Sequence, residues 1–315
     1  MSIIIFIIVL LLLILSHEFG HFIVAKRFGI RVDEFGFGFP PRLFSFKKGE
    51  TKYSFNIIPF GGFVKIFGEN PNDIEFKNSS DKERAIISKP KYAQASVLFA
   101  GVFFNLLLAW FLLSISFISG LPTISDGTDP NIKNPELTII SILPNSPAEE
   151  SGLEIGDKII SISSNADMEG VSTEMIGTLK LPVFEAILKG AKSTVIFTKD
   201  ITVAFVGLIK DAVSGKADLS NITGPIGIVG ITGEAFQFGL AYLLSFIAFI
   251  SINLAVINLI PIPALDGGRL LFLLIEWIKR SPINPKVAQT INLIGFFLLI
   301  LLMLVVTYQD IVKLF

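Results

Sequence analysis

The chain contains no cysteine, which excludes disulfides, thiolate metal sites and cysteine nucleophiles. Histidine is almost as scarce, since the sequence has only His17 and His21. Charged residues make up 17% of the 315 residues, 51% are hydrophobic, and the mean hydropathy is +0.69. This composition is too apolar for an ordinary soluble domain and indicates a membrane protein. The net charge of −1 provides no general attraction for nucleic acid, so no nucleic-acid partner is expected.

Four segments are long and apolar enough to span a bilayer: about 3–25, 95–120, 238–262 and 289–308. The first is not typical of a signal peptide, because no Lys or Arg precedes its apolar run and it has no small-residue cleavage site. Pro261 and Pro263 interrupt the third segment near its end. Breaks of this kind at membrane depth commonly line a cavity or a site.

The connecting segments differ in charge. Residues 26–92 contain 13 Lys or Arg and residues 269–288 contain 4, whereas residues 121–236 contain 8 against 15 Asp or Glu. The positive-inside rule therefore predicts that the first two segments face the cytoplasm and the third lies outside. The chain is predicted to be a multi-pass protein of the cytoplasmic (inner) membrane with both termini outside.

Two connecting segments carry β patterns. Residues 33–67 alternate apolar and polar residues between Gly and Pro, which predicts a cytoplasmic-side, membrane-associated β-meander. Residues 137–162 contain two strand candidates, and residues 183–213 have an amphipathic pattern expected to lie on the outer membrane surface. The predicted parts are a first transmembrane helix (1–30), the β-meander with a loop (31–92), a second transmembrane helix (93–120), an outer domain (121–182), the membrane-surface segment (183–236), a third transmembrane helix (237–268) and a cytoplasmic loop with the fourth helix (269–315).

The chemistry of the chain is concentrated in His17-Glu18-Phe19-Gly20-His21, within the first span. Residues four apart lie on one face of a helix, so the two imidazoles can hold one metal ion, with Zn²⁺ as the expected cofactor. Glu18 can accept a proton from the attacking water and pass it to the leaving amine. The alternative is a chance match on a buried helix. The cost of ionisable groups in a membrane and the lack of any other histidine argue against that alternative.

A zinc site needs a third protein ligand, which here must be an oxygen donor. Among the carboxylates in or near the other spans, Glu234 and Asp310 lie at the outer ends, and Glu276 fits an ordinary charge at the cytoplasmic boundary. Asp266 follows the interrupted third span on the predicted cytoplasmic side, at the depth predicted for the histidines. It is therefore the predicted third ligand, although an Asp-Gly pair is also an ordinary turn at a helix boundary.

Several motifs together resemble the site-2 protease family, specifically the bacterial branch that cleaves anti-sigma factors and signal-peptide remnants. They extend over most of the chain: His17-Glu18-x-x-His21, Pro59-Phe-Gly-Gly-Phe-Val-Lys65, Phe99-Ala-Gly-Val-Phe-Phe-Asn105, Gly224-Pro225-Ile226-Gly227 and Asn258-x-x-Pro261-x-Pro263-x-Leu265-Asp266-Gly267. The resemblance implies an intramembrane zinc metalloendopeptidase whose partners are single-span membrane protein substrates and the lipid bilayer. It implies zinc held by His17, His21 and Asp266, with Glu18 as the base and Asn258 as a substrate-binding residue.

The resemblance also raises expectations about other parts of the chain. The edge of the β region could pair with an unwound substrate, or the region could simply shield the site. Asn258 could instead form a helix-to-helix hydrogen bond, and Asn105 is expected to be structural. Residues 137–162 resemble the start of a PDZ domain, but its usual continuation is not evident before Val183. We therefore expect a truncated, PDZ-like outer domain that acts as a size filter. Gln94 stands where the family usually has Arg.

Two other classes of protein stay open on the residues alone. Two histidines and one carboxylate also describe the facial iron site of an oxygenase, although the adjacent Glu18 favours hydrolysis. A non-catalytic membrane scaffold or transporter with an outer binding module is the other alternative. The sequence does not identify the substrate, the cleavage site or the oligomeric state.

Overall fold

The computed structural model describes residues 2–69, 80–125, 127, 129–143, 146–160, 170–215 and 223–313. Four helices in these ranges are long and apolar enough to cross a membrane. They are α1 (Ser2–Arg27), α3 (Lys91–Ser119), α7 (Leu240–Leu259) and α9 (Pro285–Lys313). The predicted helical protein with four candidate spans is therefore confirmed.

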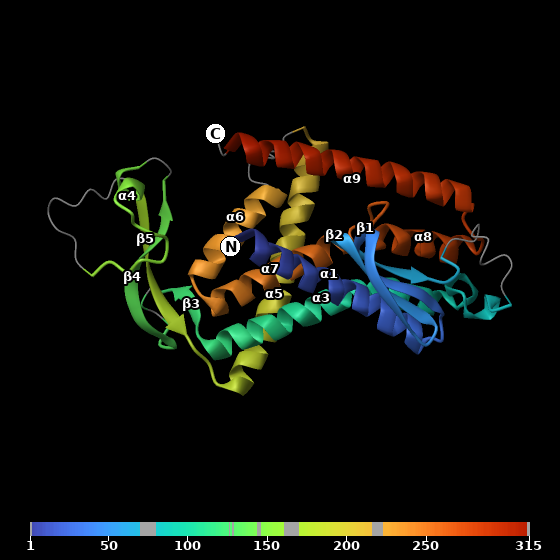
Figure 1. Ribbon diagram of the computed structural model, residues 1–315, viewed down its shortest axis with the longest axis horizontal. Coiled ribbons are helices and arrows are strands. Elements are labelled where there is room, and N and C mark those ends of the chain that lie inside the picture. Colours follow the sequence, from blue (N-terminus) through green and yellow to red (C-terminus); the bar gives the residue numbers. More distant parts are fainter. Residues whose placement is uncertain are drawn as a thin grey trace.

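The centre of the molecule is formed by α3, which packs against α1 on one side and α7 on another (Figure 1). Each contact carries a hydroxyl-to-carbonyl hydrogen bond between helices. Ser16 Oγ donates to Phe104 O at 3.2 Å, and Ser251 Oγ donates to Asn105 O at 2.8 Å. Such bonds add to close packing where lipid provides no hydrophobic force between helices. Helix α3 thus holds α1 in a fixed position relative to the end of α7.

The segment after α1 forms an antiparallel sheet of β1 (Val32–Lys48) and β2 (Thr51–Ile66). Both strands are long and irregular, so that residues 34–37 pair with residues 52–55 and also with residues 62–65. The β structure agrees with the prediction, but a meander would pair only consecutive strands. Gly38 and Gly61 have φ values of 77° and 115°, which lets each strand turn back within its length.

Two short 3₁₀ turns, Lys82–Arg84 and Ile86–Ser88, lead from the sheet region into α3. The predicted loop over residues 69–90 lies partly outside the described residues. Gln94, in the first turn of α3, is buried and donates from Nε2 to Lys89 O at 2.7 Å. At this position, glutamine holds the start of α3 against the preceding turn.

A small three-stranded antiparallel sheet lies at one end of the molecule, away from β1 and β2 (Figure 1). Its strands are β3 (Leu121–Ile124), β4 (Ile132–Ile142) and β5 (Val171–Leu179), in the order β3-β5-β4. The short helix α4 (Pro147–Glu150) follows β4. The first of the two strand candidates in residues 137–162, which covers 137–143, falls largely within β4. The second extends to residue 162 and lies partly outside the described residues, while Lys158 forms an isolated bridge to Thr138.

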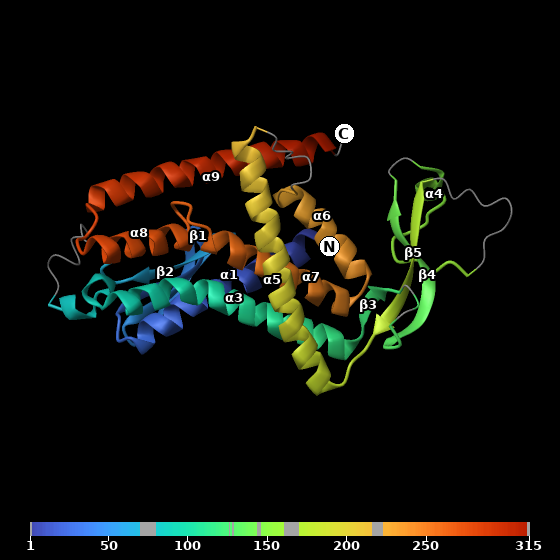
Figure 2. The same ribbon diagram turned by 180° about the vertical axis from the view of Figure 1, so that it is seen from behind.

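Helix α5 (Val183–Val213) crosses α3 and α7 on the outside of the bundle (Figure 2). It accounts for the amphipathic pattern predicted at residues 183–213. After it, α6 (Pro225–Gln237) packs against α1 and α7. Asp310 of α9 accepts hydrogen bonds from Gly224 N at 3.0 Å and Gly227 N at 2.9 Å, at the start of α6. A carboxylate is favoured there, because the first amides of a helix have no partner in the helix.

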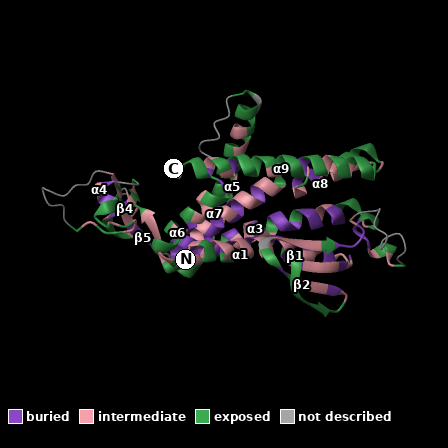
Figure 3. Ribbon diagram, turned by 45° about the horizontal axis from the view of Figure 1, so that its top comes forward, coloured by how far each residue is buried: buried purple, intermediate pink, exposed green. Residues whose placement is uncertain are grey.

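Beyond α7 the chain makes a short turn, forms α8 (Asp266–Lys279), and returns as α9. Sequence analysis did not anticipate α8, because its residues were assigned to a cytoplasmic loop and the end of the third span. Helix α9 is mostly exposed (Figure 3), and its exposed side chains are largely apolar. An exposed apolar surface on a helix of this length is the pattern expected for contact with lipid.

Candidate metal centre and catalytic cavity

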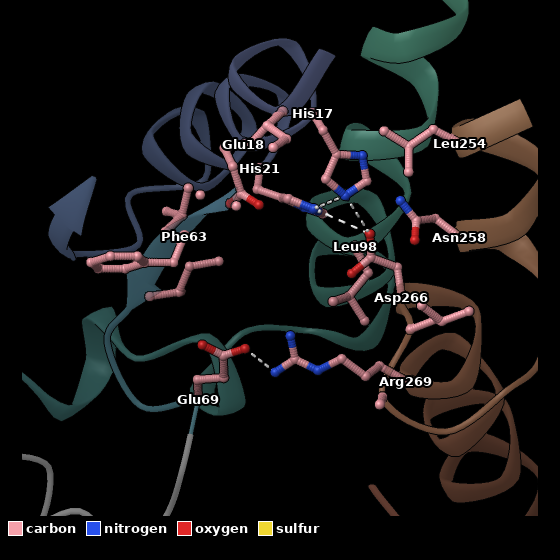
Figure 4. A pocket seen from close by; sticks show the side chains of 17 residues that line it. His17, Glu18, His21, Phe63, Glu69, Leu98, Leu254, Asn258, Asp266 and Arg269 are labelled. Atoms are coloured by element: carbon pink, nitrogen blue, oxygen red, sulfur yellow. Dashed lines mark hydrogen bonds and ion pairs between the residues drawn. The ribbon is translucent and has the colours of Figure 1, made fainter. Parts of the chain in front are cut away.

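Three donor atoms from two helices converge at one side of a cavity (Figure 4). His17 and His21 lie one turn apart on α1, and their Nε2 atoms are 3.2 Å apart. Asp266 is the first residue of α8, and its Oδ2 lies 3.0 Å from His17 Nε2 and 3.2 Å from His21 Nε2. The structure therefore brings together the three residues that the sequence predicted as ligands, although they are about 245 positions apart in the chain.

This arrangement fits a zinc ion. Zinc bonds to histidine nitrogen and carboxylate oxygen are roughly 2.0–2.2 Å long, which separates tetrahedral ligand atoms by about 3.3 Å. The three observed separations are close to this value. Asp266 Oδ2 is also buried without a well-formed hydrogen bond, so a cation would compensate it. The donor set leaves the fourth tetrahedral position for water or substrate, as in catalytic sites.

Contacts behind the histidines orient their rings. His21 Nδ1 lies 2.8 Å from Val97 O on α3 and can only donate there, which leaves Nε2 free as the metal ligand. His17 Nδ1 lies 3.4 Å from the side-chain amide of Asn105. When His17 Nε2 binds a metal, its Nδ1–H needs an acceptor, and the amide oxygen of Asn105 can provide one after rotation of the amide. Asn105, expected to be structural, thus contacts the site directly.

Two glycines let α1 and α3 approach closely around the imidazoles. A Cβ at Gly101 would lie 2.5 Å from His21 Nε2 and 2.6 Å from His17 Cε1. A Cβ at Gly20 would collide with the carbonyl of Ala100. Glycine at position 101 is therefore a steric requirement of the histidine pair, because a larger residue there would displace both rings.

The position of Asp266 depends on the turn between α7 and α8. Helix α7 ends at Leu259, as expected from Pro261 and Pro263, and Ala264 has a left-handed φ of 76°. Helix α9 holds this turn: Asn292 Oδ1 accepts from Ala264 N at 3.2 Å, and Gly295 packs directly against Pro263. A non-glycine residue with this φ persists only where surrounding contacts determine it.

The metal centre lies in a cavity of about 470 Å³, within the range typical of ligand sites. Glu18 and Asn258 both line it, from α1 and from the last turn of α7 (Figure 4). One wall is formed by residues 61–64 of β2. Gly62 is packed against α1, since a Cβ there would lie 3.1 Å from Glu18 Cγ. A carboxylate, an amide and part of a strand therefore border one space together with the metal centre.

Two of the carboxylates weighed against Asp266 have other partners. Asp310 accepts from the amides at the start of α6. Glu276 pairs with Lys91 and accepts from Ile283 N at 3.0 Å, which ties α8 to α3 and to the segment just before α9. Neither belongs to the cluster around the histidines.

Some residues of the site could not be found by motif reasoning. Val97 contributes only its carbonyl, so its side chain carries no signal. Asn292 lies in α9, whose apolar pattern predicts only a transmembrane helix, and it binds the backbone amide of Ala264. Asn105 and Gly101 were visible only as members of a resembling motif, in which Asn105 was expected to be structural and Gly101 had no stated role.

A metal centre of two histidines and one carboxylate, beside a glutamate and within a multi-span helical protein, is typical of a metal-dependent hydrolase. A model of peptidase family M50 matches residues 5–302. The chain therefore belongs to peptidase family M50, and the resemblance to site-2 proteases is confirmed.

Full-length relatives give the same result. A protein of Clostridium perfringens named as a zinc metalloprotease is 35% identical, with 95% of each chain covered. The regulator of sigma-W protease RasP of Bacillus subtilis is 31% identical over 100% of this chain and 99% of its own length. The zinc metalloprotease RasP of Geobacillus kaustophilus is 29% identical, with 100% and 98% covered. The alignment with the Bacillus subtilis protein extends over 432 positions, so that relative contains segments that this chain of 315 residues lacks.

Proposed function

We propose that this M50 zinc metalloprotease uses His17, His21 and Asp266 as its metal ligands and Glu18 as its general base. The observation that carries the proposal is the convergence of the three donor atoms within 3.2 Å of one another, beside Glu18. Bound zinc supplies Lewis acidity, which polarises a peptide carbonyl and makes a water molecule easier to deprotonate. The residues of the chain supply the proton transfers and the positioning.

Glu18 follows His17 directly in α1, and its carboxylate faces the same cavity as the imidazoles (Figure 4). It is not one of the three clustered donors, so it is free to take a proton from the attacking water. The same carboxyl group then gives that proton to the amine nitrogen as the peptide C–N bond breaks. One side chain thus serves both halves of the hydrolysis.

Asn258 and β2 are proposed to hold the substrate chain. A transmembrane helix must unwind before cleavage, which exposes backbone amides and carbonyls that need partners. Residues 61–64 of β2 line the cavity, and Asn258, which lies on another side of it (Figure 4), can both donate and accept. Pairing with a strand edge on one side and Asn258 on the other would compensate the hydrogen bonds lost on unwinding.

The proposed substrates are single-span membrane proteins, such as anti-sigma-factor-like proteins or signal-peptide remnants. The name of the Bacillus subtilis relative, a regulator of a sigma factor, supports the first class. We keep the orientation from the charge bias, with β1–β2 and α8 at the cytoplasmic face of the inner membrane and the small β3–β5 sheet outside. This places the metal centre toward the cytoplasmic side.

The small outer sheet is proposed to limit substrate size. It joins the end of α3 to the start of α5, and β3 and β5 form its base. A truncated, PDZ-like domain at this place would block substrates that carry a bulky outer segment while admitting short ones. The greater length of the Bacillus subtilis relative fits a shortened outer region in this chain, which is the interpretation we adopt.

The test of this function is the cleavage of a membrane-anchored reporter by purified protein in lipid vesicles. Glu18→Gln keeps the shape of the side chain but removes its basicity, so cleavage should fall by about 100-fold or more while bound zinc is retained. Glu185→Gln, at an exposed glutamate in the first turn of α5, is the matched control and should cleave normally. Cleavage by Glu18→Gln at the rate of the control would refute the assignment of Glu18.

A further inference from the structure

A second cavity adjoins the catalytic cavity and shares part of its wall. It has a volume of about 580 Å³ and lies between the start of α3, helix α8 and the start of α9. Glu69, Leu98 and Arg269 line both cavities. The two spaces are therefore separated by these three side chains, of which two carry charge.

The two charged side chains form an ion pair. Arg269 Nη2 donates to Glu69 Oε1, which links α8 to the residue that follows the end of β2 by three positions. Both side chains are partly exposed, at 35% and 31%, although they lie between cavities inside the molecule. Figure 4 shows the pair across the cavity from the histidines and Asp266. The pair faces space on both sides and is not embedded in packed side chains, so either partner could be exchanged for a ligand.

The charges of the catalytic cavity are uneven. Among the described residues that line it, Arg269 is the only Lys or Arg, whereas Glu18, Glu69 and Asp266 are all acidic. Arg269 interacts electrostatically with Asp266 and Glu18 as well as with Glu69. It lies one turn after Asp266 on α8, so its side chain leaves the helix on the same side as that of Asp266.

Peptide hydrolysis changes the charge in this space. The substrate backbone is neutral, but the N-terminal fragment leaves the reaction with a new carboxylate. Glu18, Glu69 and Asp266 repel an anion, and a planar guanidinium is the side chain best suited to bind one in two-pronged fashion. Arg269 is the one group on this wall that distinguishes product from substrate by charge.

We propose that Arg269 binds the newly formed C-terminal carboxylate of the product by exchanging it for Glu69, and that this exchange opens the second cavity as the exit path for that fragment. The inference rests on the proposed proteolytic function, because it needs a cleaved peptide. Lys91 lines the second cavity further along and is likewise paired with a carboxylate, that of Glu276. The path therefore carries a second cation in the same kind of reversible pair.

The test compares two peptides that differ only at their C-terminus: N-acetyl-Leu-Ala-Phe with a free carboxylate, and its C-terminal amide. Binding of each is measured to the full chain in lipid nanodiscs carrying Glu18→Gln, so that no turnover is needed. The carboxylate form should bind about tenfold or more tightly than the amide, as expected for a charge-assisted pair. Adding Arg269→Gln should reduce that ratio to about one, and adding Glu69→Gln should raise it, because Arg269 is then unpaired.

Arg84→Gln is the matched control, since Arg84 is also paired with a glutamate, Glu50, but lines neither cavity. It should leave the ratio unchanged. Equal binding of the acid and the amide to the Glu18→Gln protein would overturn the inference. If Arg269→Gln does not fold, Glu69→Gln decides instead, and a ratio that it does not raise would overturn the inference. If Arg269→Gln still binds the acid more tightly than the amide, the carboxylate binds at the histidine cluster, and the inference is overturned. Failure of the parent enzyme to cleave any reporter would instead count against the proposed function.

Discussion

Small groups on α3 decide whether the two histidines of α1 can bind the same metal ion. Gly101 is the residue of α3 nearest to both rings, and a methyl group there would lie within 2.6 Å of each. Asn105, one turn further along, contacts His17 from the same helix. The second helix is thus part of the metal centre without supplying a ligand, because it fixes how the imidazoles are oriented.

Gly101→Ala should weaken zinc binding by roughly 10–100-fold, as is usual when the groups that orient metal ligands are disturbed. Cleavage should fall with it, while the protein remains in the membrane because α3 keeps its length and apolar character. Competition with a fluorescent zinc chelator gives the affinity. Gly207→Ala, in α5 where an added Cβ meets nothing within 4 Å, is the control and should bind zinc like the parent. Equal affinities for the two variants would contradict the steric role.

At this scale the sequence was informative where a residue type is chemically unusual for its place. Two histidines in an apolar helix, and no other histidine or cysteine, pointed to an oxygen ligand and then to Asp266. It was uninformative where the backbone acts, as at Val97 O, or where a common residue supports a turn, as Asn292 does. Such roles depend on which segments meet in space.

Among the elements, the turn between α7 and α8 and the helix α9 act together. Two prolines end α7, and Asp266 is the first residue of α8. Gly267 and Gly268 allow the start of α8 to pack against the carbonyls of residues 259, 260 and 262. Asn292 of α9 holds the left-handed residue Ala264. A helix that contributes no ligand thus positions the third one.

Asn292→Ala should loosen this turn and lower zinc affinity, because Ala264 N loses its acceptor and Asp266 is no longer held at the histidines. A weakening of several-fold, smaller than for Gly101→Ala, is expected, since Gly295 still packs against Pro263. The same chelator competition measures it. Asn253→Ala is the control, because the half-buried Asn253 side chain donates to Phe249 O within its own helix. A loss of affinity that is equally large in the control would contradict the role of α9.

Helices and strands were easier to predict where their hydrophobic pattern extends over more residues. Long apolar runs gave all four spans, and the prolines gave the end of α7. Residues 33–67 were recognised as β structure, but the double pairing of residues 34–37 depends on contacts with segments 52–55 and 62–65. Helix α8 was missed because its amphipathic pattern begins directly after a Gly-Gly pair, which favours a loop assignment.

On the scale of the whole molecule, the small sheet lies at one end, outside the helix bundle that contains the metal centre (Figure 1). It joins the bundle through the segments on either side of it, at the end of α3 and the start of α5, and Leu181 N donates to Phe117 O at 3.0 Å. Residues 124 and 176 are directly paired across β3 and β5. A two-residue turn can therefore join the chain at that pair, a change that also removes β4 and the packing of its Ile132 against the bundle.

Replacing residues 125–175 by an Asn-Gly turn should keep zinc binding and the cleavage of a reporter with a short outer segment. The shortened enzyme should gain cleavage of a reporter that carries a folded outer domain, if the sheet excludes such substrates. Both reporters are compared in lipid vesicles with the full chain. A shortened enzyme that still rejects the bulky reporter would remove the size-filter role, and one that lost the short reporter would show that the sheet binds substrate.

The central claim is that His17, His21 and Asp266 hold a zinc ion, and the metal content of purified protein tests it most directly. Elemental analysis should find one zinc per chain in the parent and in Glu18→Gln, and little in Asp266→Ala. Asp310→Ala, which removes a carboxylate engaged at α6, should retain zinc. Full zinc content in Asp266→Ala, or iron in place of zinc in the parent, would contradict the account.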